Sequence, residues 1–240
     1  MPLFTRGEFC KLLIVLLFPF QSAFYEIVAG LWVRNGLQIK GQAMTYIQCH
    51  FCKSMVDADL FLLQLCATKL PTEQYINNIL DRFQVRGWLS MSNSPLAAAS
   101  RGAGDRVYRD QEQELQMVES FLVLLISILS LRTNLGLDEE ALTRLEMVSL
   151  LCMGDKTHST LHEHIPEKSA TTVPLELFDK VLVEVAQFSE PRFEASGNMQ
   201  QGIYLPTAHV WENLYDPIYV LLRAVHRRDF QTSIERFSNL

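Results

Sequence analysis

The feature that most constrains the fold is a series of short helical patterns across residues 137–206. Asp138 is placed to cap a first helix, which Gly154 ends. Thr157 or Ser159 then opens a second, shorter helix that a proline ends. Apolar residues at helical spacing lie between these signals, which favours helices with one buried face.

A third helix and a hairpin follow. Apolar residues at intervals of four, four and three predict a helix over Leu175–Phe188, and Pro191 closes it. Arg192–Glu194 and Gln201–Leu205 flank the glycine-containing loop Ala195–Asn198, which is typical of a β-hairpin. Three helices and a terminal hairpin predict a winged helix. We expect it to fold by itself around Leu142, Leu145, Leu151, Leu161, Val181, Val185 and Tyr204.

The rest of the chain is also helical in pattern. Asp57 and Asp59 can cap one helix, and Thr72 is placed to cap the next. Residues 87–110 are rich in Ser, Ala, Gly and Pro and predict a flexible linker. Phe121–Leu131 is apolar all round apart from two serines, which predicts the core of the longest helix, buried at the centre of the fold and too short to span a bilayer.

The N-terminus allows two interpretations. Arg6 and Lys11 precede the apolar run Leu12–Phe20, which has the length of a signal-peptide core. Glu8, the interrupting Pro19 and a poor cleavage pattern favour a buried segment instead. Five scattered cysteines, an odd number, favour a reducing compartment. We therefore expect a cytoplasmic protein with no membrane span, and keep a secreted helical protein as the alternative.

Charge argues against nucleic-acid binding. The chain has 21 Lys and Arg against 27 Asp and Glu, a net charge of −6. The third helix of the winged helix carries Glu176, Asp179 and Glu184 against the single Lys180, and this acidity would repel phosphates. A transcription-type nucleic-acid binder remains the alternative. Its one candidate phosphate surface, expected on a single last helix capped by Asp216, is the basic cluster Arg223, His226, Arg227 and Arg228.

No pattern of residues predicts an active site. Cys49 and Cys52 have the spacing of half a zinc site, but a second cysteine pair is missing. The sequence has no nucleophile elbow and no phosphate-binding glycine loop. Three neighbouring histidines and two further cysteines are better explained as a solvated short helix and as buried apolar positions. These residues are His158, His162, His164, Cys66 and Cys152. We predict no catalytic, cofactor-binding or metal-binding residue.

Three sequence segments resemble those of a known family. They are Ala29–Leu37, Glu146–Ser159 and Met199–Tyr204, and they resemble segments of the UBR-type E3 ubiquitin ligases, the N-recognin family, in that family's order. The residues of these three segments are most similar to those of the family's type-3 branch. The resemblance extends from about Tyr25 to Phe237 and implies part of a RING-type ligase of the N-degron pathway of ubiquitin-dependent protein degradation.

The resemblance also implies partners. In the family, a UBR box recognises degrons and a RING-type domain recruits the E2 ubiquitin-conjugating enzyme, and both hold zinc. Five scattered cysteines cannot build either domain, so we expect no cofactor and no ubiquitin transfer by this chain alone. Its expected partners are the E2 enzyme, substrate and the remaining ligase domains, which it would position relative to one another.

The sequence as a whole predicts a mainly α protein, a helical scaffold followed by a winged-helix domain with a small β-hairpin. The expected parts are an N-terminal apolar segment outside the family (1–24), a helical scaffold (25–86), a flexible linker (87–110), a long buried helix (111–136), the winged-helix domain (137–206) and C-terminal helices (207–240).

Overall fold

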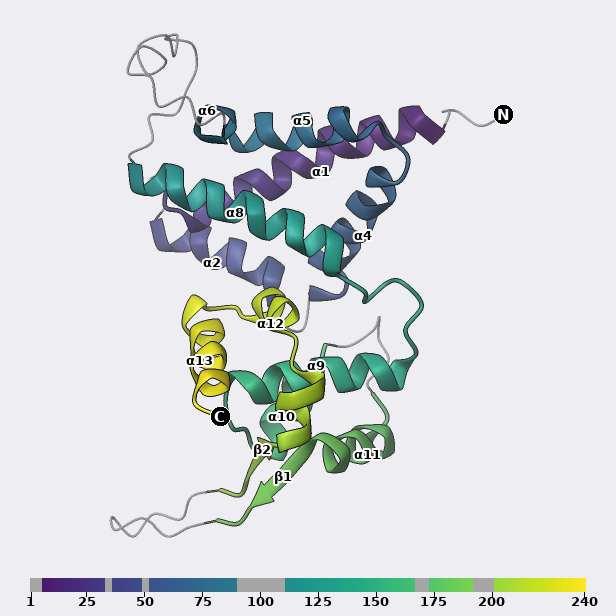
Figure 1. Cartoon of the computed structure of the whole chain (residues 1–240), viewed down its shortest axis with the longest axis vertical. Helices are drawn as coiled ribbons and strands as arrows, with labels where there is room; N and C mark the ends of the chain where they lie inside the picture. Colours follow the sequence, from purple (N-terminus) through teal and green to yellow (C-terminus); the bar gives the residue numbers. More distant parts are fainter. Residues whose placement is uncertain (1–5, 33–35, 49–51, 90–110, 167–172, 192–200) are drawn as a thin grey trace. The chain divides into compact units, whose positions relative to one another are not determined.

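The computed structural model describes residues 6–32, 36–48, 52–89, 111–166, 173–191 and 201–240 (Figure 1). The fold is mainly α-helical with one two-stranded antiparallel sheet, which confirms the predicted fold class. The chain forms two compact units. The first consists of residues 1–43 and 59–129, and the second of residues 44–58 and 130–240.

The first unit is a set of packed helices. Its core includes Phe83, whose ring lies 5.7 Å from that of Tyr25 and 6.1 Å from that of Phe121, measured between centroids. The Tyr75 hydroxyl donates a hydrogen bond to the Leu63 carbonyl at 3.0 Å. Its elements are α1 (Arg6–Val28), most of α2 (Gly36–Ile47) and of α4 (Val56–Ala67), α5 (Thr72–Phe83), α6 (Arg86–Leu89) and α8 (Gln111–Ser130).

Several predicted boundaries in this unit change. The helix α1 has 23 residues and runs without a break through position 24, so it is longer than α8, which has 20. Thr72 is the first residue of α5 and does not cap it, because Pro71 occupies the cap position. The first three residues of the predicted linker, 87–89, belong to the short helix α6 (Arg86–Leu89), and residues 90–110 lie outside the described part.

The helix α8 is less buried than predicted. It ends at Ser130, and although Phe121, Leu124 and Ile128 are buried, Leu122 and Leu129 are exposed. An apolar sequence all round the helix therefore does not mean burial all round it, because only one side of α8 faces the core of its unit. By length and composition alone, Glu112–Ser130 could cross a membrane. This is weak evidence, since core helices of soluble proteins pass the same test.

The second unit contains the winged helix. The predicted caps are confirmed: the Asp138 side chain accepts a hydrogen bond from the Ala141 amide, Thr157 accepts one from the Thr160 amide, and Gly154 ends the first helix. Its elements are α9 (Glu139–Met153), α10 (His158–His164), α11 (Leu175–Val185), β1 (Ala186–Ser189), β2 (Ile203–Pro206), η1 (Val210–Leu214), α12 (Pro217–Arg223) and α13 (Arg227–Ser238).

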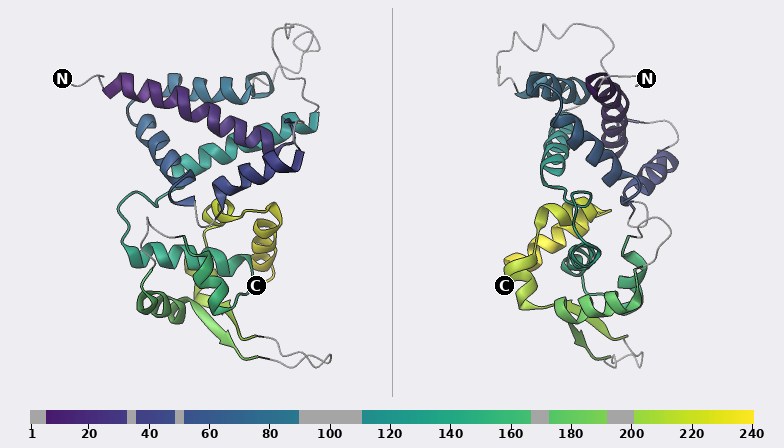
Figure 2. Two further views of the ribbon diagram at one scale, coloured as in Figure 1. Left: turned by 180° about the vertical axis from the view of Figure 1, so that it is seen from behind. Right: turned by 90° about the vertical axis from the view of Figure 1, so that its right-hand side faces the viewer.

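The hairpin begins earlier than predicted. The third helix ends at Val185, and the next four residues form β1, which pairs with β2 (Figure 2). In this pairing Phe188 lies opposite Tyr204. The Thr207 amide donates to the Val185 carbonyl, which closes the ladder at the helix end. A Cβ at Gly202 would lie 2.5 Å from the exposed Phe188 ring, so a larger residue there would have to displace that ring. The predicted strand at 192–194 and its loop lie outside the described residues.

The core of the second unit extends beyond the predicted winged helix. Leu142, Leu151, Leu161, Val181 and Val185 are buried as predicted, whereas Leu145 and Tyr204 are partly buried. The same core also receives residues from η1 and α12, which lie after position 206. These are Val210, Trp211 and Val220. Residues 137–206 alone would leave this part of the core open, so the expectation that they fold by themselves needs the C-terminal elements added.

Candidate functional site

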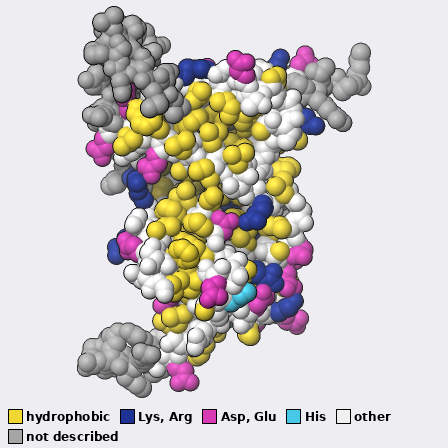
Figure 3. Space-filling view, viewed as in Figure 1, with side chains coloured by type: hydrophobic (Ala, Val, Ile, Leu, Met, Phe, Trp, Pro, Cys, Tyr) yellow, Lys and Arg dark blue, Asp and Glu magenta, His cyan; other side chains and the backbone are white. Residues whose placement is uncertain are grey.

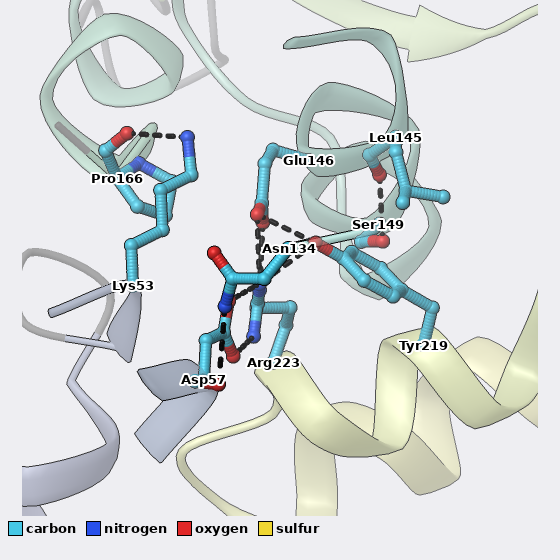
Figure 4. A network of polar contacts seen from close by, with 9 residues as sticks. All are labelled: Lys53, Asp57, Asn134, Leu145, Glu146, Ser149, Pro166, Tyr219 and Arg223. Atoms are coloured by element: carbon cyan, nitrogen blue, oxygen red, sulfur yellow. Dashed lines mark hydrogen bonds and ion pairs between the residues drawn. The ribbon is translucent and has the colours of Figure 1, made fainter. Parts of the chain in front are cut away.

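A buried network of charged side chains joins distant segments of the second unit (Figure 4). The Arg223 guanidinium, at the end of α12, donates to both carboxylate oxygens of Asp57 at 2.9 and 2.8 Å. It also donates to both carboxylate oxygens of Glu146 on α9, each at 2.8 Å. The Tyr219 hydroxyl donates to Glu146 at 2.6 Å. Two carboxylates thus share one guanidinium in a bidentate geometry, which is strong and directional.

The charges in this network determine each other's ionisation. Burial alone would raise the pKa of Glu146, but the charge of Arg223 and hydrogen bonds from Arg223 and Tyr219 outweigh burial and hold this pKa below its ordinary value. Burial raises the pKa of Tyr219 well above its ordinary value. The pKa of Arg223 is raised well above its ordinary value, because its acidic neighbours outweigh the burial that would lower it. The carboxylate of Glu146 and the guanidinium are therefore charged at neutral pH.

Hydrogen bonds from this network and beside it hold Lys53 and Asp57 against the rest of the second unit. The Asn134 side-chain amide donates to the Asp57 carbonyl at 3.1 Å, and the Lys53 ammonium donates to the Pro166 carbonyl at 2.8 Å. Burial lowers the pKa of Lys53. Asp57, expected from the sequence to cap a helix, is instead the second residue of α4 and a buried ion-pair partner with no exposed side-chain surface.

Arg223 shows why the sequence could not reveal this network. Its side chain is only 4% exposed, and it does not share a solvated face with its basic neighbours. The helix predicted after Asp216 breaks at Ala224, so that Arg227 and Arg228 begin α13 as exposed residues. Asp57 and Arg223 are 166 positions apart, so no local spacing could have paired them.

The outer face of α11 is where a DNA-binding winged helix would contact the groove. The Lys180 ammonium bonds to Glu140 of α9 at 2.5 Å, and the Arg144 guanidinium holds Glu184 at 2.8 and 3.0 Å. Charged groups of α11 are thus engaged by its own domain. Leu175 and Val183 of the same helix are exposed, with Val183 80% accessible.

The three histidines do not converge on one point. His158 Nε2 lies 2.9 Å from an Asp179 oxygen, and His164 Nδ1 lies 2.8 Å from the Thr160 carbonyl oxygen. His158 and His162 each place a ring edge-on to buried Phe178. A shallow, mainly apolar pocket opens between α10 and α11. It is lined by His158, Ser159, His162, Glu163, Val173 and Leu175.

Among the described residues, the cysteines are not grouped with other side chains that could hold zinc. Cys52, Cys66 and Cys152 are buried, as predicted for Cys66 and Cys152, and Cys49 lies outside the described residues. Burial raises the pKa of Cys52 and of Cys152 to about 12, so both thiols are protonated at neutral pH. Within the described ranges, no three His, Cys, Asp or Glu side chains are grouped so that they could hold a metal ion.

Comparison with known proteins matches two parts of the chain to models of one protein family. The family model of the UBR1/2/3-like ARM repeat domain matches residues 11–124, and that of the winged-helix domain of UBR1-like E3 ubiquitin-protein ligases matches residues 142–239. The first match begins inside the segment 1–24 that we expected to lie outside the resemblance. The second includes the C-terminal elements that complete the core.

Individual relatives agree with these matches. The chain is 46% identical over 222 residues to E3 ubiquitin-protein ligase ubr3 of Danio rerio and 44% identical over 222 residues to UBR3 of Homo sapiens, in each case over 91% of this chain and 11% of the relative. It is 46% identical over 235 residues to Ubr3 of Drosophila melanogaster, over 98% of this chain and 10% of the relative. The chain thus spans about a tenth of the length of these relatives.

Proposed function

The chain belongs to the UBR family of E3 ubiquitin-protein ligases, as part of the ARM-repeat and winged-helix regions, and we propose that it serves as a scaffold that positions E2-binding and substrate-binding modules. The observation that carries this proposal is the outer face of α11. Its Lys180, Asp179 and Glu184 are engaged by α9 and α10, and it presents Val183 to solvent. Such a face suits a protein neighbour better than a phosphate backbone.

The buried network supports the same proposal. A domain that positions other domains must hold its own elements in one arrangement, and Arg223 joins α9, α12 and the segment around Asp57 by directional ion pairs. We also propose a cytoplasmic location, which the buried thiols of Cys52, Cys66 and Cys152 support.

The experiment replaces the matched 222-residue segment of the Danio rerio relative with this chain, and in a second version with a flexible linker. Two reactions are measured with E1, E2, ubiquitin and ATP. Discharge of ubiquitin from E2 onto free lysine needs E2 activation only. Ubiquitination of the ligase itself also needs the acceptor to be placed near the E2.

The scaffold proposal expects the chimera with this chain to perform both reactions. The linker version should keep discharge onto free lysine and lose at least about tenfold of its self-ubiquitination, since placement contributes only to the second reaction. If the linker version modifies itself as fast as the chimera, the positioning role is wrong.

A further inference from the structure

The pocket between α10 and α11 is a cavity with fixed walls on the surface of the second unit. Its volume is about 490 Å³, which lies in the range of sites that hold a ligand. The contact of 2.9 Å between His158 Nε2 and an Asp179 oxygen joins the two helices. Below it, the rings of His158 and His162 pack edge-on against buried Phe178. These contacts form the pocket before any ligand arrives.

Apolar surface continues from the pocket along α11. Leu175 lines the pocket and is 55% exposed, and Val183, about two turns further along the helix, is 80% exposed. Sites for small molecules bury most of the ligand surface, which a shallow pocket cannot do. A peptide segment can instead place one side chain in the pocket and lie along α11 with the rest. The shape therefore favours a protein segment as the occupant.

One carboxylate of the pocket determines the charge of that segment. Figure 3 shows acidic and basic side chains gathered over α11, and there Glu184 pairs with Arg144 of its own domain. Glu163, which lines the pocket, is exposed, and within the described part of the chain no hydrogen bond or ion pair engages it. It is the last residue but one of α10, where the helix dipole disfavours a carboxylate.

No lysine or arginine is among the described residues that line the pocket. A cation supplied by the occupant would therefore complement a carboxylate that its own domain leaves unpaired. A phosphate backbone has the opposite charge and does not fit beside Glu163.

We propose that the pocket between α10 and α11 binds a peptide segment of a partner protein, with a Leu, Ile or Met side chain in the pocket and a Lys or Arg beside it. The apolar side chain packs against Val173 and Leu175 and contributes most of the affinity, and the cation meets Glu163 and selects the partner. This inference rests on the scaffold proposal, since it names the chemistry of a protein neighbour. The two can fail separately, because peptide binding is measured on the chain without any ligase reaction.

The test uses three peptides of about nine residues, long enough to extend from the pocket along α11, with both termini capped. The Lys peptide has a central Leu between two Lys in a Gly and Ser chain. The Glu peptide replaces both Lys with Glu, and the Ser peptide replaces the Leu with Ser. Binding to the full 240-residue chain is measured by fluorescence anisotropy. The Lys peptide should bind at least about fivefold more tightly than either of the others.

A pair of charge reversals separates the pocket from general attraction. The net charge of the chain is −6, so any basic peptide is attracted to some extent, and Glu163→Lys and Glu212→Lys reduce this attraction equally. Glu212 is an exposed residue of η1 and does not line the pocket. Only Glu163→Lys should lower the preference for the Lys peptide over the Glu peptide, by at least about fivefold relative to Glu212→Lys. Lysine suits the last turn of α10, so the fold should persist, and circular dichroism verifies this.

A second pair of variants tests the apolar part. Leu175→Gln should weaken binding of the Lys peptide at least about fivefold, whereas Leu135→Gln, at a leucine of the same unit that is 58% exposed, should leave it unchanged. Equal effects of the two lysine variants, or no effect of Leu175→Gln, would overturn the proposal. So would a stable dimer that Leu175→Gln abolishes, since that result would assign the pocket to a second copy of the chain.

Discussion

Arg223 joins two buried carboxylates of the second unit. It meets the carboxylates of Asp57 and Glu146 with no more than 4% of any of the three side chains exposed. A buried charge is costly unless it is paired, and here each group is paired through several hydrogen bonds. The net contribution of such a network to stability is small, but the loss of one partner leaves the others uncompensated.

The change Arg223→Met should therefore destabilise the protein by about 3–5 kcal/mol, because two buried carboxylates lose their counter-charge. The measurement is the free energy of unfolding from a urea titration followed by circular dichroism. Arg228→Met, at an exposed position of α13, is the control and should change stability by less than about 0.5 kcal/mol. A similar small effect of both changes would show that the network does not hold the unit together.

Glu146 makes part of the stability depend on pH. Its folded pKa lies below the ordinary value, so ionised Glu146 contributes stability that is fully present above the unfolded pKa and is lost as pH falls through the folded pKa. Glu146→Gln should remove this dependence. The free energy of unfolding of the unchanged chain should fall more steeply than that of Glu146→Gln as pH decreases from about 5. Parallel curves would contradict the assignment.

At the scale of single elements, α11 separates a buried face from an exposed one within two positions. Val181 is fully buried in the core, whereas Val183 is 80% exposed. Val181→Asp should destabilise the unit by several kcal/mol, because it buries an unpaired carboxylate. Val183→Asp makes the same change outside the core and should be nearly neutral. Thermal unfolding of the two variants compares them directly, and a cooperative, unshifted transition for Val181→Asp would contradict the helix orientation.

The charges of α11 predict weak affinity for nucleic acid. At about 150 mM salt the chain should not retain duplex DNA, because Lys180 is engaged by Glu140 and acidic residues surround it. Retention at low salt should come from Arg227 and Arg228, and Ala at both should remove most of it, while Lys180→Ala should not. An electrophoretic mobility shift series over salt measures this. Tight binding that depends on Lys180 would favour the transcription-type alternative.

Local signals in the sequence predicted several helix caps correctly but misplaced the start of the hairpin. Caps such as Asp138 and Thr157 act through hydrogen bonds to amides three residues away, so the sequence alone locates them. The start of the hairpin was misplaced because Phe188 continues the apolar spacing of α11, although its backbone pairs with Tyr204. Strand pairing depends on a partner sixteen positions away, and helical spacing cannot reveal it.

At the scale of the whole molecule, the units do not follow the linear segments that the sequence suggested. Residues 44–58 precede much of the first unit yet belong to the second, where Asp57 meets Arg223. The C-terminal residues complete the winged-helix core through Val210, Trp211 and Val220. Composition and spacing predicted the architecture, but contacts between residues that are distant in sequence decide what folds together, and those contacts have no local pattern.

The scaffold role is tested most directly by comparing two variants of the chimeric ligase described above, Val181→Asp and Val183→Asp. Each is measured for discharge of E2-bound ubiquitin onto free lysine and for self-ubiquitination. We predict that Val181→Asp keeps discharge and loses at least about tenfold of self-ubiquitination, because the winged helix no longer folds and the acceptor is no longer positioned. Val183→Asp should keep both reactions. Undiminished self-ubiquitination in the Val181→Asp chimera, with the winged helix unfolded, would contradict the account.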